Sequence, residues 1–226
     1  MIDYLFISPL GWSRHIWDKI TTDKRFSNKS FEIVEFLNDS FENISEEFIS
    51  KCISDNLNKL SPEGVVITSS FGTIALISTL INSNISMNRL ILIDGFDIIP
   101  SPEELNNIFS DVKDEYYQQL SDYYDNILCG DEKEDLELLN ILNHNLTVEN
   151  DVYTPKLDIK STLSYLSIYS NRDIEKSFLS ISDKVSSFSI FSNLPISISH
   201  TAIREENHLL MLKEPKELLG AIFQSD

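Results

Sequence analysis

Short apolar runs alternate along the chain with longer amphipathic stretches. Runs of four to six mostly β-branched or aromatic residues are typical of buried strands, and apolar residues three or four apart are typical of helices. The alternation predicts an α/β domain with a mainly parallel sheet. The predicted strands are residues 4–7, 31–36, 65–68, 90–93, 163–169, and finally either 188–191 or 196–199. The predicted helices are residues 44–60, 71–81, 174–185 and 209–223.

The alternating pattern is interrupted after the strand that ends at Asp94. Residues 101 to about 145 are acidic, have helical spacing and contain no obvious strand. We therefore expect an α/β core of residues 1–96 and 156–226 that carries a helical cap of residues 97–155. Four tyrosines of this insertion are spaced to bury one helix face and to leave rings facing a pocket. They are Tyr116, Tyr117, Tyr123 and Tyr124.

Composition and charge narrow the possible partners. The 226 residues are 42% apolar and 24% charged, which is ordinary for a globular protein. The formal net charge of −18 argues against nucleic acid and anionic membranes as partners. No apolar run is long enough for a membrane span, and the first residues do not resemble a signal peptide. Cys52 and Cys129 lie far apart, so we expect neither a metal site nor disulfides, and a cytoplasmic location.

The first candidate for chemistry is the segment 65–73, VVITSSFGT. A β-branched strand leads through a turn of small residues into an apolar helix, with Ser70 on the turn. The backbone N–H that follows the serine, at Phe71, and the helix N-terminus would stabilise the anion formed in acyl transfer. The hydrolase elbow motif G-x-S-x-G is matched at Ser70 and Gly72, whereas Thr68 replaces the first glycine. The alternative is an ordinary connection in which Ser70 caps the helix.

The first loop also joins a strand to a helix start. Gly11 lies in the turn, Trp12 follows it, and Trp17 falls inside the next helix. In a hydrolase this loop supplies the second N–H of the oxyanion hole, which makes Trp12 the predicted donor. Alternatively, both tryptophans belong to the core.

A histidine and an aspartate could complete a catalytic triad. His208 lies on a polar turn directly before an apolar helix, and His200 is its competitor. Asp173 lies on a polar turn after the predicted strand 163–169, with Asp183 and Asp94 as rivals. The alternatives are a surface histidine and an aspartate that caps a helix. We predict that Asp173 orients His208.

These features together resemble the α/β-hydrolase superfamily over nearly the whole chain. Ser70, Asp173 and His208 follow the family's order, and three of the six glycines lie at strand ends. The segments GWSRHIW at 11–17 and ENHLLMLKEP at 206–215 are similar to the family's oxyanion loop and histidine loop. The length and the stretch YYQQLSD at 116–122 weakly resemble the carboxylesterases that demethylate pimeloyl-acyl-carrier-protein ester in biotin synthesis.

The resemblance implies an α/β-hydrolase fold with about six to seven strands and a carboxylesterase activity. Ser70 would attack the carbonyl, His208 would transfer the proton and Asp173 would hold the imidazole. The N–H groups of Phe71 and Trp12 would bind the oxyanion, the tyrosines would line the pocket, and no metal or cofactor would be needed.

Two other functions are compatible with the same residues, namely an acyl thioesterase and a non-catalytic binding protein that retains the fold. The substrate would be a small-molecule or carrier-protein-linked acyl ester. Carrier proteins are acidic, so the acidic insertion opposes a carrier protein, and only the basic residues Arg14, Lys19, Lys24 and Arg25 favour one. The acyl group, the alcohol and the oligomeric state are left open.

Overall fold

A single six-stranded sheet forms the centre of the molecule. The computed structural model describes residues 1–37 and 44–224. All strand pairs of the sheet are parallel, in the order β2-β1-β3-β4-β7-β8. The strands are β1 (Ile2–Leu10), β2 (Phe31–Phe36), β3 (Leu60–Ser69), β4 (Met87–Ile93), β7 (Val185–Ser192) and β8 (Thr201–Ala202). The predicted α/β class and mainly parallel sheet are confirmed, and 188–191, rather than 196–199, lies in a strand.

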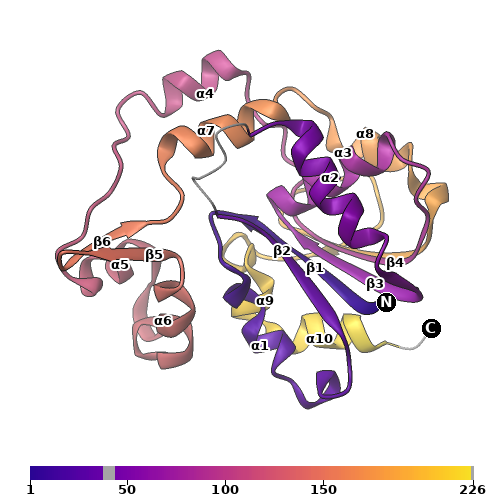
Figure 1. Ribbon diagram of the computed structural model, residues 1–226, viewed down its shortest axis with the longest axis horizontal. Helices are drawn as coiled ribbons and strands as arrows, with labels where there is room; N and C mark the ends of the chain where they lie inside the picture. Colours follow the sequence, from indigo (N-terminus) through magenta and orange to yellow (C-terminus); the bar gives the residue numbers. More distant parts are fainter. Residues whose placement is uncertain (38–43, 225–226) are drawn as a thin grey trace.

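Helices cover both faces of the sheet (Figure 1). On one face lie α2 (Glu46–Leu57), α3 (Phe71–Ile81), α7 (Ile159–Ile168) and α8 (Ile174–Leu179). On the other lie η1 (Arg14–Trp17), α1 (Asp18–Thr21), η2 (Lys24–Phe26), α9 (Leu210–Lys213) and α10 (Pro215–Phe223). Within the described residues, no helix is long and apolar enough to cross a membrane.

The apolar runs are continuous because both faces of the sheet are buried. In β1, Leu5 and Ile7 contribute to the cluster under α2 and α3, whereas Tyr4 and Phe6 contribute to the cluster under α1 and α10. Neighbouring side chains of a strand point to opposite faces, so an uninterrupted apolar run supplies two cores at once.

The predicted strand 163–169 is wrong, because these residues lie mainly in helix α7. Asp158 caps the helix, and its side chain accepts a hydrogen bond from the Ser161 N–H at 2.6 Å. Tyr165 and Tyr169, one turn apart, pack against Phe71 with ring centroids 5.6 and 5.4 Å away. The apolar residues of this segment therefore resemble those of a strand in sequence, although in the structure they form one face of a helix.

The insertion between β4 and β7 is not purely helical. It contains α4 (Pro102–Ile108), α5 (Leu120–Ile127), η3 (Gly130–Glu134), α6 (Leu136–Asn143) and an antiparallel hairpin, β5 (Leu146–Glu149) with β6 (Val152–Pro155). Asn150 and Asp151 turn the hairpin with φ angles of 51° and 61°, which is a conformation these two residue types tolerate. The hairpin and α5 lie together at one end of the molecule, and α4 packs against α7 (Figure 1).

Candidate active site

Ser70 occupies a strained turn between β3 and α3. Its φ and ψ angles are 51° and −119°, a region that non-glycine residues rarely adopt. Its N–H donates to the Ile93 carbonyl of the neighbouring strand at 2.7 Å, and its own carbonyl accepts from the Thr73 N–H at 2.9 Å. Strain of this kind persists only where the surroundings enforce it, and such residues cluster at functional sites.

Two glycines allow the close packing on which the turn depends. A Cβ atom on Gly72 would lie 2.7 Å from the Ile7 carbonyl oxygen and 2.8 Å from that of Ser8. A Cβ atom on Gly95 would collide with the carbonyl oxygen of Ser70. These contacts bring the ends of β1 and β4 against the turn from both sides.

Thr68, which replaces the first glycine of the elbow motif, is fully buried within β3. Its hydroxyl is hydrogen-bonded to that of Thr73 at 2.8 Å. The extra side chain therefore fills space beneath the turn and satisfies its own polar group. The elbow geometry at Ser70 is retained despite the substitution.

We expect Gly72→Ala to destabilise the protein by about 1–3 kcal/mol, because the new methyl group meets backbone that cannot move aside. Gly220→Ala is the matched control, since Gly220 also lies in a helix and a Cβ atom there would meet nothing within 4 Å. That variant should gain about 0.5–1 kcal/mol from the lower backbone entropy of its unfolded state. Urea unfolding of both variants measures the two changes, and equal stability of both would contradict the packing argument.

Asp94 and His208 form a hydrogen-bonded pair beside the turn. Asp94 Oδ2 lies 2.8 Å from His208 Nδ1, and Asp94 Oδ1 accepts from the Asn193 N–H at 2.8 Å. The aspartate is buried, with 1% of its surface exposed, and has a φ angle of 51°. The hydrogen bond between His208 and the Asp94 carboxylate raises the pKa of His208 above its ordinary value. The negative charge of Asp97 adds to this rise, and burial opposes it.

The topology brings these groups to one edge of the sheet. Because the strands are parallel, the loop at Gly11 after β1, Ser70 after β3 and Asp94 after β4 lie along the carboxyl edge. The chain order reverses between β1 and β3, which is where open α/β sheets form their ligand sites. Ser69 pairs with Ile93, so Ser70 and Asp94 follow at neighbouring strand ends. Among the side chains that the structure describes, neither Ser70 Oγ nor His208 Nε2 has a hydrogen-bond partner.

The structure corrects the predicted partner of His208. Asp173 is the N-cap of α8, where its side chain accepts from the Lys176 N–H at 2.9 Å, so the prediction that it contacts His208 is wrong. Asp183 lies directly before β7, at the opposite edge of the sheet. His200 Nδ1 is 2.9 Å from the Ile198 carbonyl. The signal that favoured Asp94 was its place directly after the strand that follows the Ser70 helix.

The backbone N–H groups of Phe71 and Trp12, the two predicted oxyanion donors, differ in how far other groups of the protein engage them. Phe71 is the first residue of α3, so its N–H has no acceptor within the helix. Gly11 has a φ angle of 78°, which turns the chain sharply after β1. Among the described residues, the Trp12 N–H makes one hydrogen bond, a long one of 3.4 Å to the Pro9 carbonyl.

The comparisons with known proteins concern the fold. No protein-family profile and no curated protein matches the sequence. Solved structures do match, although they share little sequence. E-2-(acetamidomethylene)succinate hydrolase is 12% identical and has a TM-score of 0.65, with 97% of this chain and 89% of that one covered. The chain has the α/β-hydrolase fold.

Two further solved structures have similar folds. The thioesterase domain from the curacin biosynthetic pathway is 11% identical, with a TM-score of 0.67 over 98% of this chain and 90% of that one. The peroxisomal α/β-hydrolase Lpx1 from Saccharomyces cerevisiae is 13% identical, with a TM-score of 0.62 over 97% and 74%. At this level of identity the likeness establishes the fold of the chain, and the site must be judged from its own residues.

The four tyrosines predicted to line the pocket do not share one environment. Tyr117 and Tyr123 are buried against each other, with ring centroids 5.3 Å apart, inside the apolar cluster that joins the insertion to the core. Tyr124 is partly buried, and its hydroxyl donates to Asn143 at 2.6 Å. Tyr116 is exposed and lines two adjacent cavities. Tyr117 and Tyr123 line neither of these two cavities and pack against each other in the insertion, so their role in binding a substrate stays a prediction.

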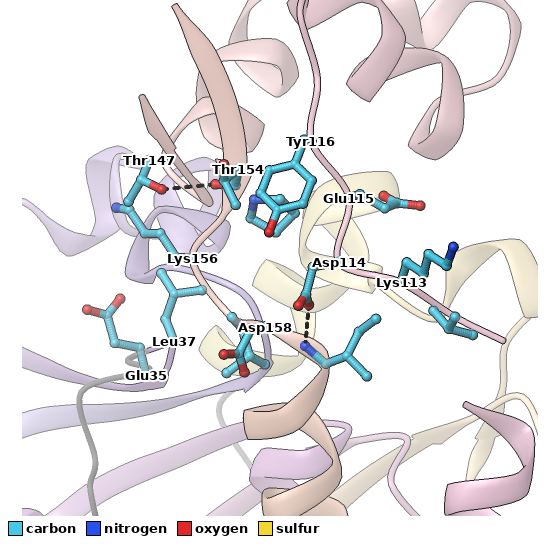
Figure 2. Close-up of a pocket in the computed structure, with 14 residues that line it drawn as sticks. Glu35, Leu37, Lys113, Asp114, Glu115, Tyr116, Thr147, Thr154, Lys156 and Asp158 are labelled. Atoms are coloured by element: carbon cyan, nitrogen blue, oxygen red, sulfur yellow. Dashed lines mark hydrogen bonds between the residues drawn. The ribbon is translucent and has the colours of Figure 1, made fainter. Parts of the chain in front are cut away.

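One of these cavities lies beside the loop that follows β1 and has a volume of about 650 Å³. Figure 2 shows Tyr116 and Asp114 on one side of it and the hairpin residues Thr147 and Thr154 on the other. Leu157, which also lines it, would lie 3.5 Å from a Cβ atom on Gly11. The cavity thus adjoins the carboxyl end of β1, although neither Ser70 nor His208 lines it.

Two carboxylates in the wall of this cavity accept hydrogen bonds from backbone N–H groups of the protein. Asp114 accepts from the Ile159 N–H at 2.9 Å (Figure 2), and Glu35 accepts from the Arg14 N–H at 2.5 Å. No group of three or more His, Cys, Asp or Glu side chains in the described part of the chain is placed to hold a metal ion.

Proposed function

We propose that this protein is a serine-dependent hydrolase of carboxylic esters. The observation that carries the proposal is the strained Ser70 turn next to the hydrogen-bonded pair of the buried Asp94 and the partly exposed His208. An accessible hydroxyl at a helix N-terminus, a histidine and a carboxylate are the three parts of a catalytic triad. Asp94 takes the role that the sequence pattern assigned to Asp173.

In the proposed reaction, Ser70 Oγ attacks the ester carbonyl while His208 Nε2 accepts the hydroxyl proton. Nδ1 of His208 donates to Asp94, which fixes the tautomer and stabilises the imidazolium that forms. The N–H groups of Phe71 and Trp12 bind the negatively charged oxygen. His208 then returns the proton to the departing alcohol, and water repeats the sequence to release the acid and restore Ser70.

Covalent labelling tests the proposal without knowledge of the natural substrate. A fluorophosphonate should modify Ser70 stoichiometrically, and the protein should hydrolyse p-nitrophenyl acetate or butyrate. Mass spectrometry of the labelled peptide locates the adduct. A folded protein that takes up no label and hydrolyses neither ester would contradict the proposal and favour a non-catalytic binding protein.

The pH dependence should report the environment of His208. Its pKa is raised by Asp94 and Asp97, and only the neutral imidazole can accept a proton. We therefore expect kcat/KM for p-nitrophenyl acetate to fall on the acid side with an apparent pKa above the ordinary value of 6.5. Asp97→Asn should move this limb to lower pH because it removes a nearby negative charge. An unchanged limb in Asp97→Asn would show that His208 does not control it.

The substrate class is a narrower proposal. Ester and thioester analogues of one acyl group, assayed side by side, separate a carboxylesterase from a thioesterase. The methyl ester of pimeloyl-acyl-carrier protein is the specific candidate. Two of the basic residues that favour it are engaged within the chain, since Lys19 pairs with Asp135 at 2.7 Å and Arg25 with Asp23 at 2.8 Å. If kcat/KM for the carrier-linked ester exceeded that for the free ester by less than about tenfold, the proposal of a carrier-protein substrate would be refuted.

A further inference from the structure

One side chain of the insertion reaches the loop that carries Trp12. Asn145 follows α6 and is buried, with 5% of its surface exposed. Its Oδ1 accepts a hydrogen bond from the Ser13 N–H at 2.9 Å, across 132 residues of sequence. Ser13 is the residue directly after Trp12, so this bond joins the insertion to the candidate oxyanion loop.

The N–H groups of the loop are anchored on both sides of Trp12. The Gly11 N–H donates to the Phe36 carbonyl at 3.1 Å, and the Arg14 N–H donates to Glu35 at 2.5 Å. Ser13 is held by Asn145. Trp12 is left with only its 3.4 Å contact to Pro9, so its N–H is the least engaged donor of the loop. To bind an oxyanion, an N–H group must have no strong acceptor of its own and must point in a fixed direction.

Asn145 is itself held by contacts of its own. Its N–H donates to the Leu142 carbonyl at 2.9 Å, and its carbonyl accepts from the Lys156 N–H at 2.9 Å. Burial raises the pKa of Tyr123 to about 12, and a side-chain hydrogen bond with Asn145 opposes that rise. The backbone that carries the acceptor facing Ser13 is therefore held at both its N–H and its carbonyl.

Other contacts place this end of the insertion firmly on the core. The rings of His15 and His144 stack with centroids 3.6 Å apart. His144 directly precedes Asn145, and His15 lies two residues after Ser13, so this stack lies close to the Ser13–Asn145 bond along both segments. Asp135, which caps α6, pairs with Lys19 at 2.7 Å, and Glu132 pairs with Lys213. The end of the insertion next to the loop is thus a fixed support.

We propose that Asn145 is a positioning residue that holds the oxyanion loop in its active conformation. The inference rests on the proposed function, because it assigns Trp12 to the oxyanion hole. Asn145 does not touch the reacting atoms. It orients the Trp12–Ser13 peptide. The Trp12 N–H belongs to the neighbouring Gly11–Trp12 peptide, so fixing the first peptide limits the rotations at Trp12 that would turn this N–H away. It also gives the insertion a part in catalysis that does not depend on contact with the acyl chain.

The test compares Asn145→Ala, Asn145→Asp and the control Asn143→Ala. Aspartate keeps an oxygen acceptor of the same shape. Asn143 is two residues away and exposed, and its side chain accepts only the hydroxyl of Tyr124, far from the loop in the chain. Three quantities are measured: the rate of fluorophosphonate labelling, kcat and KM for p-nitrophenyl butyrate, and amide hydrogen exchange of residues 11–17.

We expect Asn145→Ala to reduce both kcat and the labelling rate by tenfold to about a hundredfold, with KM changed less than about threefold. Hydrogen exchange of residues 11–17 should accelerate in the same variant. Asn145→Asp should recover most of the loss, and Asn143→Ala should behave as the wild type.

Three results would overturn the proposal in distinguishable ways. Normal labelling and kcat in Asn145→Ala would remove the role of Asn145 and leave the serine hydrolase intact. If Asn143→Ala lost as much kcat and labelling rate as Asn145→Ala, the loss would reflect general destabilisation of the insertion and not a specific role of Asn145. A wild-type protein that takes up no label would overturn the proposed function, and the positioning role with it.

Discussion

Replacing Ser70 with alanine is expected to lower ester hydrolysis on the order of a millionfold while the protein stays folded. The hydroxyl is the nucleophile of the proposed reaction, and no neighbouring group replaces it. Ser70 also lies at φ 51°, where alanine and serine carry a similar backbone strain, so the substitution should cost little stability. Turnover of p-nitrophenyl acetate, labelling by a fluorophosphonate and the midpoint of urea unfolding are the three measurements.

Ser69→Ala is the matched control for this variant. Ser69 is fully buried, and its hydroxyl has no hydrogen-bond partner among the described residues. Its removal takes away an unsatisfied polar group, so the stability should hold or rise and the activity should be retained. Activity that survives in Ser70→Ala, or a label that moves to Ser69, would refute the assignment of the nucleophile.

The sequence predicted the parts of the fold that local patterns determine. Strands β1, β3 and β4 contain apolar runs that are largely buried, whereas the edge strand β2 alternates buried and exposed residues. The Ser70 turn is marked by small residues between a strand and an apolar helix. The lengths of such runs and their flanking residues are enough to recognise them. The resemblance to α/β-hydrolases then supplied the correct fold.

The partner of His208 could not be found in the same way. Residues 163–169 have the pattern of a strand that leads to Asp173, yet they lie mainly in helix α7, packed on Phe71. An aspartate before a helix is recognisable as a cap from local sequence, whereas a contact between Asp94 and His208 spans 114 residues and depends on sheet order. The same limit applies to Asn145 and to Tyr123, whose partners are set by how the insertion packs on the core.

Asp94→Asn is expected to lower kcat by about ten-thousandfold, the loss typical when a triad carboxylate becomes an amide. An amide cannot stabilise the imidazolium, and its NH₂ group favours the wrong tautomer of His208. The pKa of the imidazole, which Asp94 raises, should fall in this variant. A titration of the His208 ring protons by NMR and a pH profile of kcat measure these two effects separately.

Asp173→Asn distinguishes the two carboxylates. Asparagine is as good a helix cap as aspartate, so this variant should keep both its stability and its activity. Asp173→Ala should lose about 1 kcal/mol of stability from the uncapped α8, and still turn over substrate at the wild-type rate. If Asp173→Asn instead lost activity while Asp94→Asn kept it, the hydrogen bond between Asp94 and His208 would be structural, and Asp173 would be the acid of the triad.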